Sequence, residues 1–146
     1  VVRFQGPQAN GMPELHKLIT PLAVLMNQGH QVAMVTDGRL SGASGKVPAA
    51  IHVTPEGICG GMLAKIKDGD LIRLDVGAGR LDLLLDEEAL KARDYADPGV
   101  REVRYGTGRQ IFAPLRSSLL SPEEGASSLF TYVYEKCQVK FPFQED

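Results

Sequence analysis

The stretch TDGRLSGASGKVPAAIHVTPEG, residues 36–57, decides how this chain is organised. Its first half is a polar loop, residues 37–45, which holds three glycines, two serines, one aspartate and one arginine. The loop directly follows QVAMV, residues 31–35, which is typical of a buried strand. Glycines let a backbone turn sharply and present N–H groups that can hold an anion. The loop is therefore a candidate anion-binding site, although a tight surface turn without a ligand would explain the same residues.

The spacing of the loop excludes the common glycine-rich motifs. A phosphate-binding P-loop would need a glycine where Leu40 stands and a serine or threonine where Val47 stands. A nucleophile elbow would need a glycine two residues to each side of Ser41, and neither is present. No glycine pair elsewhere is completed into a dinucleotide-binding fingerprint. Spacing alone leaves an anion-binding loop of unspecified chemistry.

Length and composition indicate one globular domain. The chain has 146 residues and 43% hydrophobic content, so we expect a single domain over residues 1–146. A net charge of -2 gives no reason to expect nucleic acid or an anionic membrane as partner. Apolar runs such as residues 22–26 are far shorter than the roughly 20 residues of a membrane span, and we expect a soluble, cytoplasmic protein. Because Val1 is not a methionine, we interpret the chain as a fragment or a processed product.

The cysteines and histidines form no metal-binding pattern. Cys59 and Cys137 are far apart and outside any C-x-x-C motif, which is typical of two reduced thiols. The three histidines, His16, His30 and His52, are scattered as well. Neither a zinc site nor a disulfide framework is predicted.

Hydrophobic periodicity predicts short strands interleaved with short helices. In the first half we expect strands at residues 1–5, 31–35 and near 51–53, and a helical region in two parts at residues 11–29. Pro13 and the Thr20–Pro21 pair are typical of the starts of the two helical parts, and Gly29 of a helix end.

The second half shows the same alternation. We expect a hairpin at residues 71–76 and 80–85, a capped helix at 86–93, a strand at 101–105, a helical segment at 108–120 and a strand or helix at 128–139. Long βαβ units are lacking, which favours a compact mixed α/β barrel over a doubly wound sheet.

Two long motifs carry a resemblance to a known family. The loop motif, with VVRFQGPQANGMPELHKL at residues 1–18, resembles the C-terminal domain of the dihydroxy-acid and phosphogluconate dehydratase family. The segments SGASGKVPAAIHVTPE and NGMPELHKL are more similar to the phosphogluconate members. The resemblance covers essentially the whole chain, and it implies the C-terminal part of an enzyme roughly four times as long. It also implies a β-barrel-like swivelling domain of about eight strands with flanking short helices, similar to that of aconitase-type enzymes.

The resemblance implies a hydro-lyase that converts 6-phospho-D-gluconate to 2-dehydro-3-deoxy-6-phosphogluconate and water, a step of the Entner–Doudoroff pathway of gluconate metabolism. The reaction needs a base, a Lewis acid for the leaving hydroxyl and a cation beside the developing enolate. The proton-accepting serine of the family falls on Ser41, and its magnesium-binding glutamate falls on Glu14. Oxygen ligands suit Mg²⁺. A carboxylate favoured by the dipole in the first turn of a helix would explain Glu14 as well.

Five residues are candidates for substrate binding: Arg39, Gly42, Ser44, Lys46 and His52. Lys46 and Arg39 would pair with the phosphate or carboxylate of the substrate, although an ordinary solvated lysine explains Lys46 equally. Asp37 is expected to orient the loop by accepting backbone N–H bonds, and Glu56 to support the site.

The resemblance also implies cofactors and partners. A [4Fe-4S] cluster would be held by cysteines of the preceding N-terminal domain, so no cluster ligand is assigned in this chain. A homodimer is implied for the full-length enzyme. Since the Lewis acid would lie in that other domain, we expect the isolated chain to fold and to be inactive. Two alternatives stay open, a dihydroxy-acid or aldonate dehydratase of the same family and a non-catalytic module that binds small anions.

Overall fold

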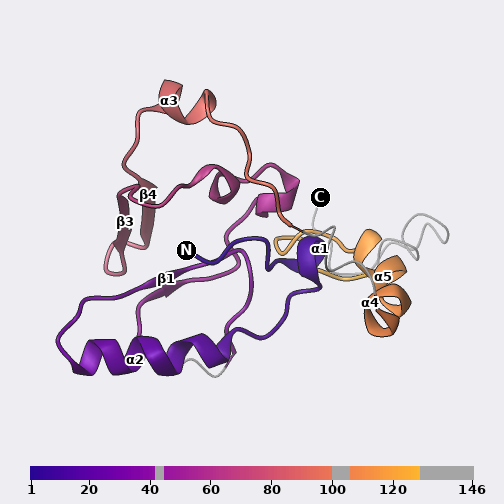
Figure 1. The fold of residues 1–146 in the computed structure, drawn as a ribbon, viewed down its shortest axis with the longest axis horizontal. Helices are drawn as coiled ribbons and strands as arrows, with labels where there is room; N and C mark the ends of the chain where they lie inside the picture. The colour runs from indigo at the N-terminus through magenta and orange to yellow at the C-terminus, as the bar shows by residue number, and fades with distance from the viewer. Residues whose placement is uncertain (42–44, 100–105, 129–146) are drawn as a thin grey trace, which may run out of the picture.

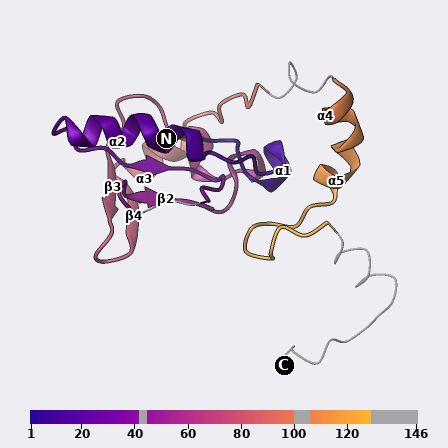
Figure 2. The ribbon, with the colours of Figure 1, turned by 90° about the horizontal axis from the view of Figure 1, so that it is seen from below.

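The computed structural model describes residues 1–41, 45–99 and 106–128, and within them the predicted mixed α/β class is confirmed. The helices are α1 (Pro7–Asn10), α2 (Ile19–Asn27), α3 (Glu87–Lys91), α4 (Thr107–Ile111) and α5 (Ala113–Ser117), with 3-10 turns η1 (His16–Leu18), η2 (Gly57–Cys59) and η3 (Met62–Lys65). The strands are β1 (Met34–Val35), β2 (Ala49–Ala50), β3 (Ile72–Asp75) and β4 (Arg80–Leu83). Helices α4 and α5 lie at the opposite end of the long axis from the β3–β4 hairpin (Figures 1 and 2).

The strand before the glycine-rich loop forms a small parallel sheet. Strand β1 pairs with β2, with Met34 opposite Ala49, and the backbone N–H of Thr36 donates to the Ala50 carbonyl at 2.9 Å. The strand predicted at residues 1–5 is reduced to an isolated bridge between Val2 and Thr36. The strand expected near 51–53 lies two residues earlier, because His52 is left-handed at φ 54° and breaks the extended run.

Helix α2 covers this sheet on one side (Figure 2). Ile19 packs with Met34, Leu40 and Val47 in a buried cluster, which joins the helix to the strand and the loop. The helix ends before Gly29, whose φ is 91°, as the sequence predicts.

The start of the helical region differs from its prediction. Pro13 lies outside any helix, since Glu14 forms an isolated parallel bridge with Arg39 instead of opening a helical turn. Thr20 is inside α2 and does not cap it. Pro21 is tolerated because the N–H groups of the first turn have no partner within the helix.

The second half follows its prediction closely. Strands β3 and β4 form the expected antiparallel hairpin, with Ile72 opposite Leu83. Helix α3 begins after Asp86, whose carboxylate accepts from the backbone N–H groups of Glu88 and Ala89. The helical segment expected at 108–120 is divided into α4 and α5 at Phe112. The strand expected at 101–105 lies outside the described residues, as does all but the first residue of the element expected at 128–139.

The short helix α1 was not predicted, because Gly6–Pro7 was interpreted as a breaker. Pro7 instead opens the helix at its first position, where a missing N–H costs nothing. No closed barrel is found in the described ranges, where each of the two sheets has two strands and no hydrogen bond joins them. No helix in the described part of the chain is long and apolar enough to cross a bilayer.

Candidate functional site

Glu14 and Ser41 contact each other directly, although they are 27 residues apart. The Ser41 hydroxyl donates to Oε2 of Glu14, and the Ser41 backbone N–H donates to Oε1 at 3.1 Å. The backbone N–H of His16 donates to the same Oε1 at 2.8 Å. The structure thus brings together the two residues to which the resemblance assigned the base and the metal ligand.

Backbone pairing between two segments produces this contact. Glu14 and Arg39 form a parallel bridge, and the Leu15 N–H donates to the Arg39 carbonyl at 3.3 Å. The Arg39 guanidinium donates from Nε to the Met12 carbonyl at 2.9 Å and lies 3.9 Å from Oε2 of Glu14. Residues 12–15 therefore run beside residues 39–41 with the carboxylate aimed at the serine.

The surroundings of Glu14 favour its ionised form. The hydrogen bond from the Ser41 hydroxyl is the main cause that lowers the pKa of Glu14, and burial opposes it. The backbone N–H groups of Ser41 and His16 and the charge of Arg39 lower the pKa further. Glu14 is therefore a carboxylate at neutral pH, suited to orient a hydroxyl or to bind a cation and poorly suited to hold a proton.

The other predicted substrate-binding residues are placed less tightly. The His52 backbone N–H donates to the Gly38 carbonyl at 3.0 Å, so His52 adjoins the loop through its main chain. Lys46 is exposed, and no hydrogen bond or ion pair joins it to Glu14, Arg39 or Ser41 in the described ranges. Gly42 and Ser44 lie outside the residues that the structure describes.

Asp37 accepts backbone N–H bonds, as the sequence predicts, but its donors lie outside the loop. The side chain is fully buried, and its oxygens accept from Phe4 at 3.0 Å, Gln5 at 2.9 Å and Gly57 at 3.0 Å. Asp37 thus joins three segments of the chain instead of shaping one turn.

Glu56 has a larger structural role than the sequence predicts. It is 2% exposed and accepts from the N–H groups of Gln8 and Ala9 at the start of α1. A sequence signal does exist, because Asp37 and Glu56 each directly precede a glycine in a polar turn, where carboxylates often bind backbone N–H groups.

Strained backbone gathers around these residues. Phe4, Met12 and His52 are left-handed, with φ of 61°, 54° and 54°, and each contacts the segment 37–39 through a backbone group. Non-glycine residues rarely adopt this conformation, and those that do cluster at functional sites. The strain supports the assignment of this region as the candidate site.

The described residues fit one magnesium ligand and no iron–sulfur cluster. They contain no group of three or more His, Cys, Asp or Glu that could hold a metal ion. Glu14 offers one carboxylate of the type that Mg²⁺ prefers. Cys59 is exposed, and its thiol donates to the Gln8 side chain at 3.1 Å. One thiol cannot hold a cluster that needs several, and Cys137 lies outside the described residues.

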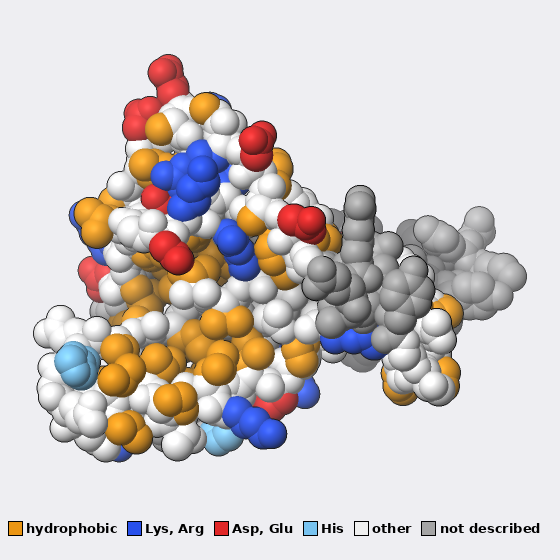
Figure 3. Space-filling model, viewed as in Figure 1, with side chains coloured by type: hydrophobic (Ala, Val, Ile, Leu, Met, Phe, Trp, Pro, Cys, Tyr) orange, Lys and Arg blue, Asp and Glu red, His pale blue; other side chains and the backbone are white. Residues whose placement is uncertain are grey.

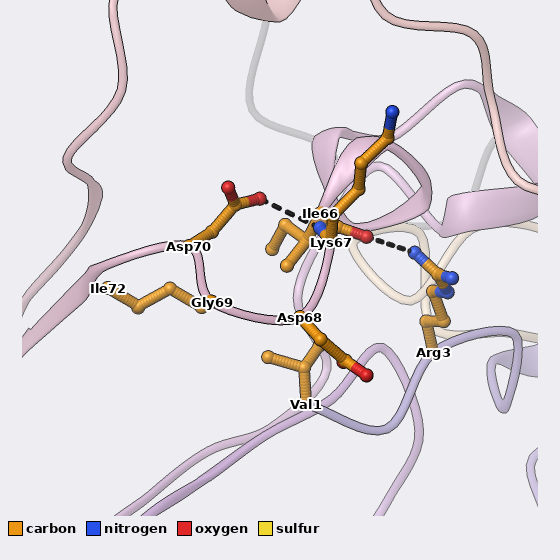
Figure 4. A pocket seen from close by; sticks show the side chains of 8 residues that line it. All are labelled: Val1, Arg3, Ile66, Lys67, Asp68, Gly69, Asp70 and Ile72. Atoms are coloured by element: carbon orange, nitrogen blue, oxygen red, sulfur yellow. Dashed lines mark hydrogen bonds between the residues drawn. The ribbon is translucent and has the colours of Figure 1, made fainter.

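A pocket in the described part of the chain lies away from this site. It has a volume of about 460 Å³, and Figure 4 shows it between Val1, Arg3 and the turn at residues 66–70. Arg3 donates to the Ile66 carbonyl at 2.5 Å, so its guanidinium is engaged in holding the turn. Hydrophobic side chains gather between α2 and the hairpin (Figure 3), where an apolar pocket of about 250 Å³ is lined by residues such as Val35 and Leu83.

Comparison with known proteins identifies the family. The family described as dihydroxy-acid/6-phosphogluconate dehydratase C-terminal matches residues 1–126, so the chain belongs to this family. The chain is 57% identical over 129 residues to the phosphogluconate dehydratase of Escherichia coli (strain K12), a match of 88% of this chain and 21% of that protein. It is 53% identical over 130 residues to the phosphogluconate dehydratase of Rhizobium meliloti (strain 1021), covering 89% and 22%.

A relative with another name is also similar. The dihydroxy-acid dehydratase of Pyrococcus abyssi (strain GE5 / Orsay) is 45% identical over 107 residues, covering 71% of this chain and 19% of that protein. The chain thus spans about a fifth of the length of the curated relatives that it matches. The family that the sequence motifs predicted is confirmed.

Proposed function

We propose that this chain is the C-terminal region of a phosphogluconate dehydratase, which removes water from 6-phospho-D-gluconate to give 2-dehydro-3-deoxy-6-phosphogluconate. The contact between Ser41 and Glu14 is the observation that carries the proposal, because it brings together the two residues to which the resemblance assigns the base and the magnesium ligand. Relatives with this name and 53% to 57% identity support the choice of substrate.

Ser41 would take the proton beside the substrate carboxylate. A serine hydroxyl is a feeble base in water, so positive charge and oriented hydrogen bonds must favour its alkoxide. Glu14 orients the hydroxyl by accepting its proton in a hydrogen bond, and Arg39 brings positive charge to within 3.9 Å of Glu14. The lowered pKa of Glu14 makes it a poor proton acceptor, so Glu14 positions the hydroxyl, and the Ser41 proton would leave to solvent water before the alkoxide takes the substrate proton.

Glu14 would also be one oxygen ligand of a Mg²⁺ ion whose other ligands lie outside the described residues. When bound, Mg²⁺ supplies positive charge that stabilises an alkoxide on Ser41 and the enolate that develops on the substrate. The loop residues Arg39, Gly42, Ser44 and Lys46 would bind the carboxylate or phosphate of the substrate, with His52 beside them.

The rest of the enzyme is part of the same proposal. The N-terminal domain would hold a [4Fe-4S] cluster, the full-length enzyme would be a cytoplasmic homodimer, and the complete C-terminal domain would form the barrel-like swivelling arrangement. The 146-residue chain alone would then be folded and inactive.

The full-length enzyme tests the role of Ser41. We expect Ser41→Ala to retain its cluster content and circular dichroism spectrum while kcat falls by about a thousandfold or more. Near-normal turnover would rule out Ser41 as the base. Assays on 6-phosphogluconate, gluconate and 2,3-dihydroxy-isovalerate test the substrate, and a preference for the branched acid would favour the dihydroxy-acid dehydratase instead.

A further inference from the structure

Two buried carboxylates lie beside the candidate site without taking part in the proposed reaction. Asp37 is 0% exposed and Glu56 is 2% exposed. Neither forms an ion pair within the described ranges, although buried carboxylates without a counter-charge are costly unless hydrogen bonds satisfy them. Asp37 accepts from the backbone N–H of Gly57, the residue after Glu56, at 3.0 Å, so the two groups are neighbours. The cost of burying two carboxylates suggests that they have a specific structural task.

Glu56 binds the start of helix α1. Its Oε2 accepts from the backbone N–H of Gln8 at 3.1 Å and from that of Ala9 at 3.2 Å. These N–H groups belong to the first turn of the helix, where no carbonyl of the helix can accept from them. A Cβ atom on Gly6 would come within 2.6 Å of Cγ of Glu56, so the side chain reaches the helix only because residue 6 is glycine.

Asp37 binds both the segment before α1 and the residue after Glu56. Its carboxylate accepts from Phe4 and Gln5, which precede α1, and from Gly57, which follows Glu56. A Cβ atom on Gly57 would lie 2.9 Å from the Phe4 ring and 3.4 Å from Oδ2 of Asp37. Together the two carboxylates accept five backbone N–H groups from three segments of the chain.

These segments lead directly to Glu14 and Ser41. Helix α1 continues into Met12, whose N–H donates to the Gly6 carbonyl at 3.1 Å and whose own carbonyl accepts from Arg39. Glu14 follows two residues later, and Ser41 follows four residues after Asp37. Both ends of the Glu14–Ser41 hydrogen bond are therefore attached to segments that the two carboxylates hold together.

We propose that Asp37 and Glu56 are positioning residues, a carboxylate clasp that holds residues 4–9 against residues 36–57 and thereby sets Glu14 against Ser41. The effect of the clasp on turnover rests on the proposed function, whereas its effect on the Glu14–Ser41 contact does not. Sites that hold reacting groups in place depend on such supporting contacts, because a misplacement of about 1 Å can cost about a hundredfold in rate.

The clasp also has a distinctive response to pH. Burial is the main cause that raises the pKa of Glu56, the nearby charge of Asp37 raises it further, and the N–H groups of Gln8 and Ala9 oppose the rise. The titratable groups that face Glu56 are Asp37 and the Cys59 thiol, whose own pKa is raised by burial and then by the two carboxylates. Acidification therefore protonates Glu56 at a higher pH than it would an exposed glutamate, which replaces its charge-assisted hydrogen bonds to α1 with weaker neutral ones while it relieves the cost of burying the charge.

Hydrogen exchange in the full-length enzyme tests the clasp independently of catalysis. The variants are Glu56→Ala and Glu56→Gln, and the matched control is Glu87→Gln, a glutamate whose side chain is 79% exposed. In Glu56→Ala we expect peptides that contain Gln8 and Ala9, and also the peptide that contains Ser41, to exchange about tenfold faster. The control should leave all of them unchanged. Faster exchange at Gln8 and Ala9 with no change at Ser41 would overturn the proposal.

Kinetics of the same variants separate positioning from folding. For Glu56→Ala we expect kcat per cluster-loaded enzyme to fall about tenfold to a hundredfold, with KM within about threefold. Glu56→Gln should recover kcat only in part, because a neutral carbonyl oxygen accepts from α1 more weakly than a carboxylate does. The acidic limb of its kcat profile should lie at lower pH, because residue 56 no longer titrates. If Glu56→Ala does not fold, this pH profile is the deciding measurement.

The experiments distinguish a failure of the clasp proposal from a failure of the proposed function. Unchanged kcat and an unchanged pH profile, with only a lower melting temperature, would reduce Asp37 and Glu56 to structural groups and overturn the proposal. Normal turnover by Ser41→Ala would instead disprove the proposed base, and the exchange of the Ser41 peptide would still decide whether the clasp exists.

Discussion

Residues 1–66 and residues 67–99 are held together in different ways. In the first region, Asp37 and Glu56 accept backbone N–H groups that are 20 to 48 residues away in sequence. In the second, the hairpin pairs neighbouring strands, Asp86 caps its own helix, and Lys91 pairs with Glu87 one turn before it. The second region has a long-range pair as well, Arg93 with Asp70, but that pair joins two side chains. The candidate site lies in the first region, where a single buried carboxylate determines the relative position of several backbone segments.

The difference shows what each arrangement can do. A hairpin or a capped helix fixes its own shape and places few residues relative to distant ones. A buried carboxylate that collects N–H groups from separate segments fixes those segments in space, but its removal leaves several donors unpaired. Hairpins and capped helices are suited to supporting elements, whereas buried carboxylates that join several segments are suited to a functional site.

The largest effect is expected for Asp37→Ala. The substitution leaves the buried N–H groups of Phe4 and Gly57 and the partly buried N–H group of Gln5 without an acceptor, and the free energy of unfolding should fall by about 3 to 5 kcal/mol. Urea unfolding measures it, with Asp68→Ala as the control because Asp68 is an exposed aspartate of the second region. Equal losses for the two variants would contradict the distinction between the regions.

A smaller effect is expected for Gly6→Ala. The new methyl group would overlap the Glu56 side chain, whose Cγ lies 2.6 Å from the position of the added Cβ. Overpacking of this kind costs about 1 to 3 kcal/mol in the free energy of unfolding. Gly108→Ala is the matched control, since nothing lies within 4 Å of the added atom and alanine favours a helix. A neutral Gly6→Ala would mean that Glu56 moves freely away from α1.

The same contrast explains which elements the sequence predicts. The hairpin, α3, α4 and α5 depend on alternation, capping residues and breakers within about ten residues, and these signals are visible in one sequence. Helix α1 was missed because a Gly–Pro pair suits a turn as well as a helix start. Pro13 was misassigned because the pairing of Glu14 with Arg39 overrides the local preference of proline for a first turn.

The site was predictable only in part. Ser41 and Glu14 came from the family motifs, and the structure places them in contact. The burial of Asp37 and Glu56 depends on where residues 4–9 and residue 57 meet, which no local pattern encodes. Local sequence therefore indicates which groups carry charge, and tertiary structure decides which of them become buried acceptors.

The third effect is a pH dependence that has opposite signs in the two regions. In the second region, two hydrogen bonds from Arg93, at 2.5 and 2.9 Å, are the main cause that lowers the pKa of Asp70 from 3.8 to about 2. The pKa is lower in the folded chain, so the pair stabilises the fold above about pH 4 and loses this effect as the pH falls toward 2. Glu56 has a raised pKa, so its contribution is present below 4.5 and is lost as the pH rises through the raised value.

Melting temperatures of Arg93→Gln and Glu56→Gln, measured between pH 2.5 and 7, separate these contributions. Arg93→Gln should lower the melting temperature above about pH 4, and its difference from the unmodified chain should shrink as the pH falls toward 2, where Asp70 of the unmodified chain begins to be protonated. Glu56→Gln should show the opposite trend, with its stability relative to the unmodified chain improving as the pH rises from about 4.5. Parallel curves for both variants would mean that neither carboxylate titrates differently in the folded chain. Opposite slopes would show that a charged pair stabilises the second region, whereas in the first region the cost of burying the Glu56 carboxylate exceeds what its backbone donors supply.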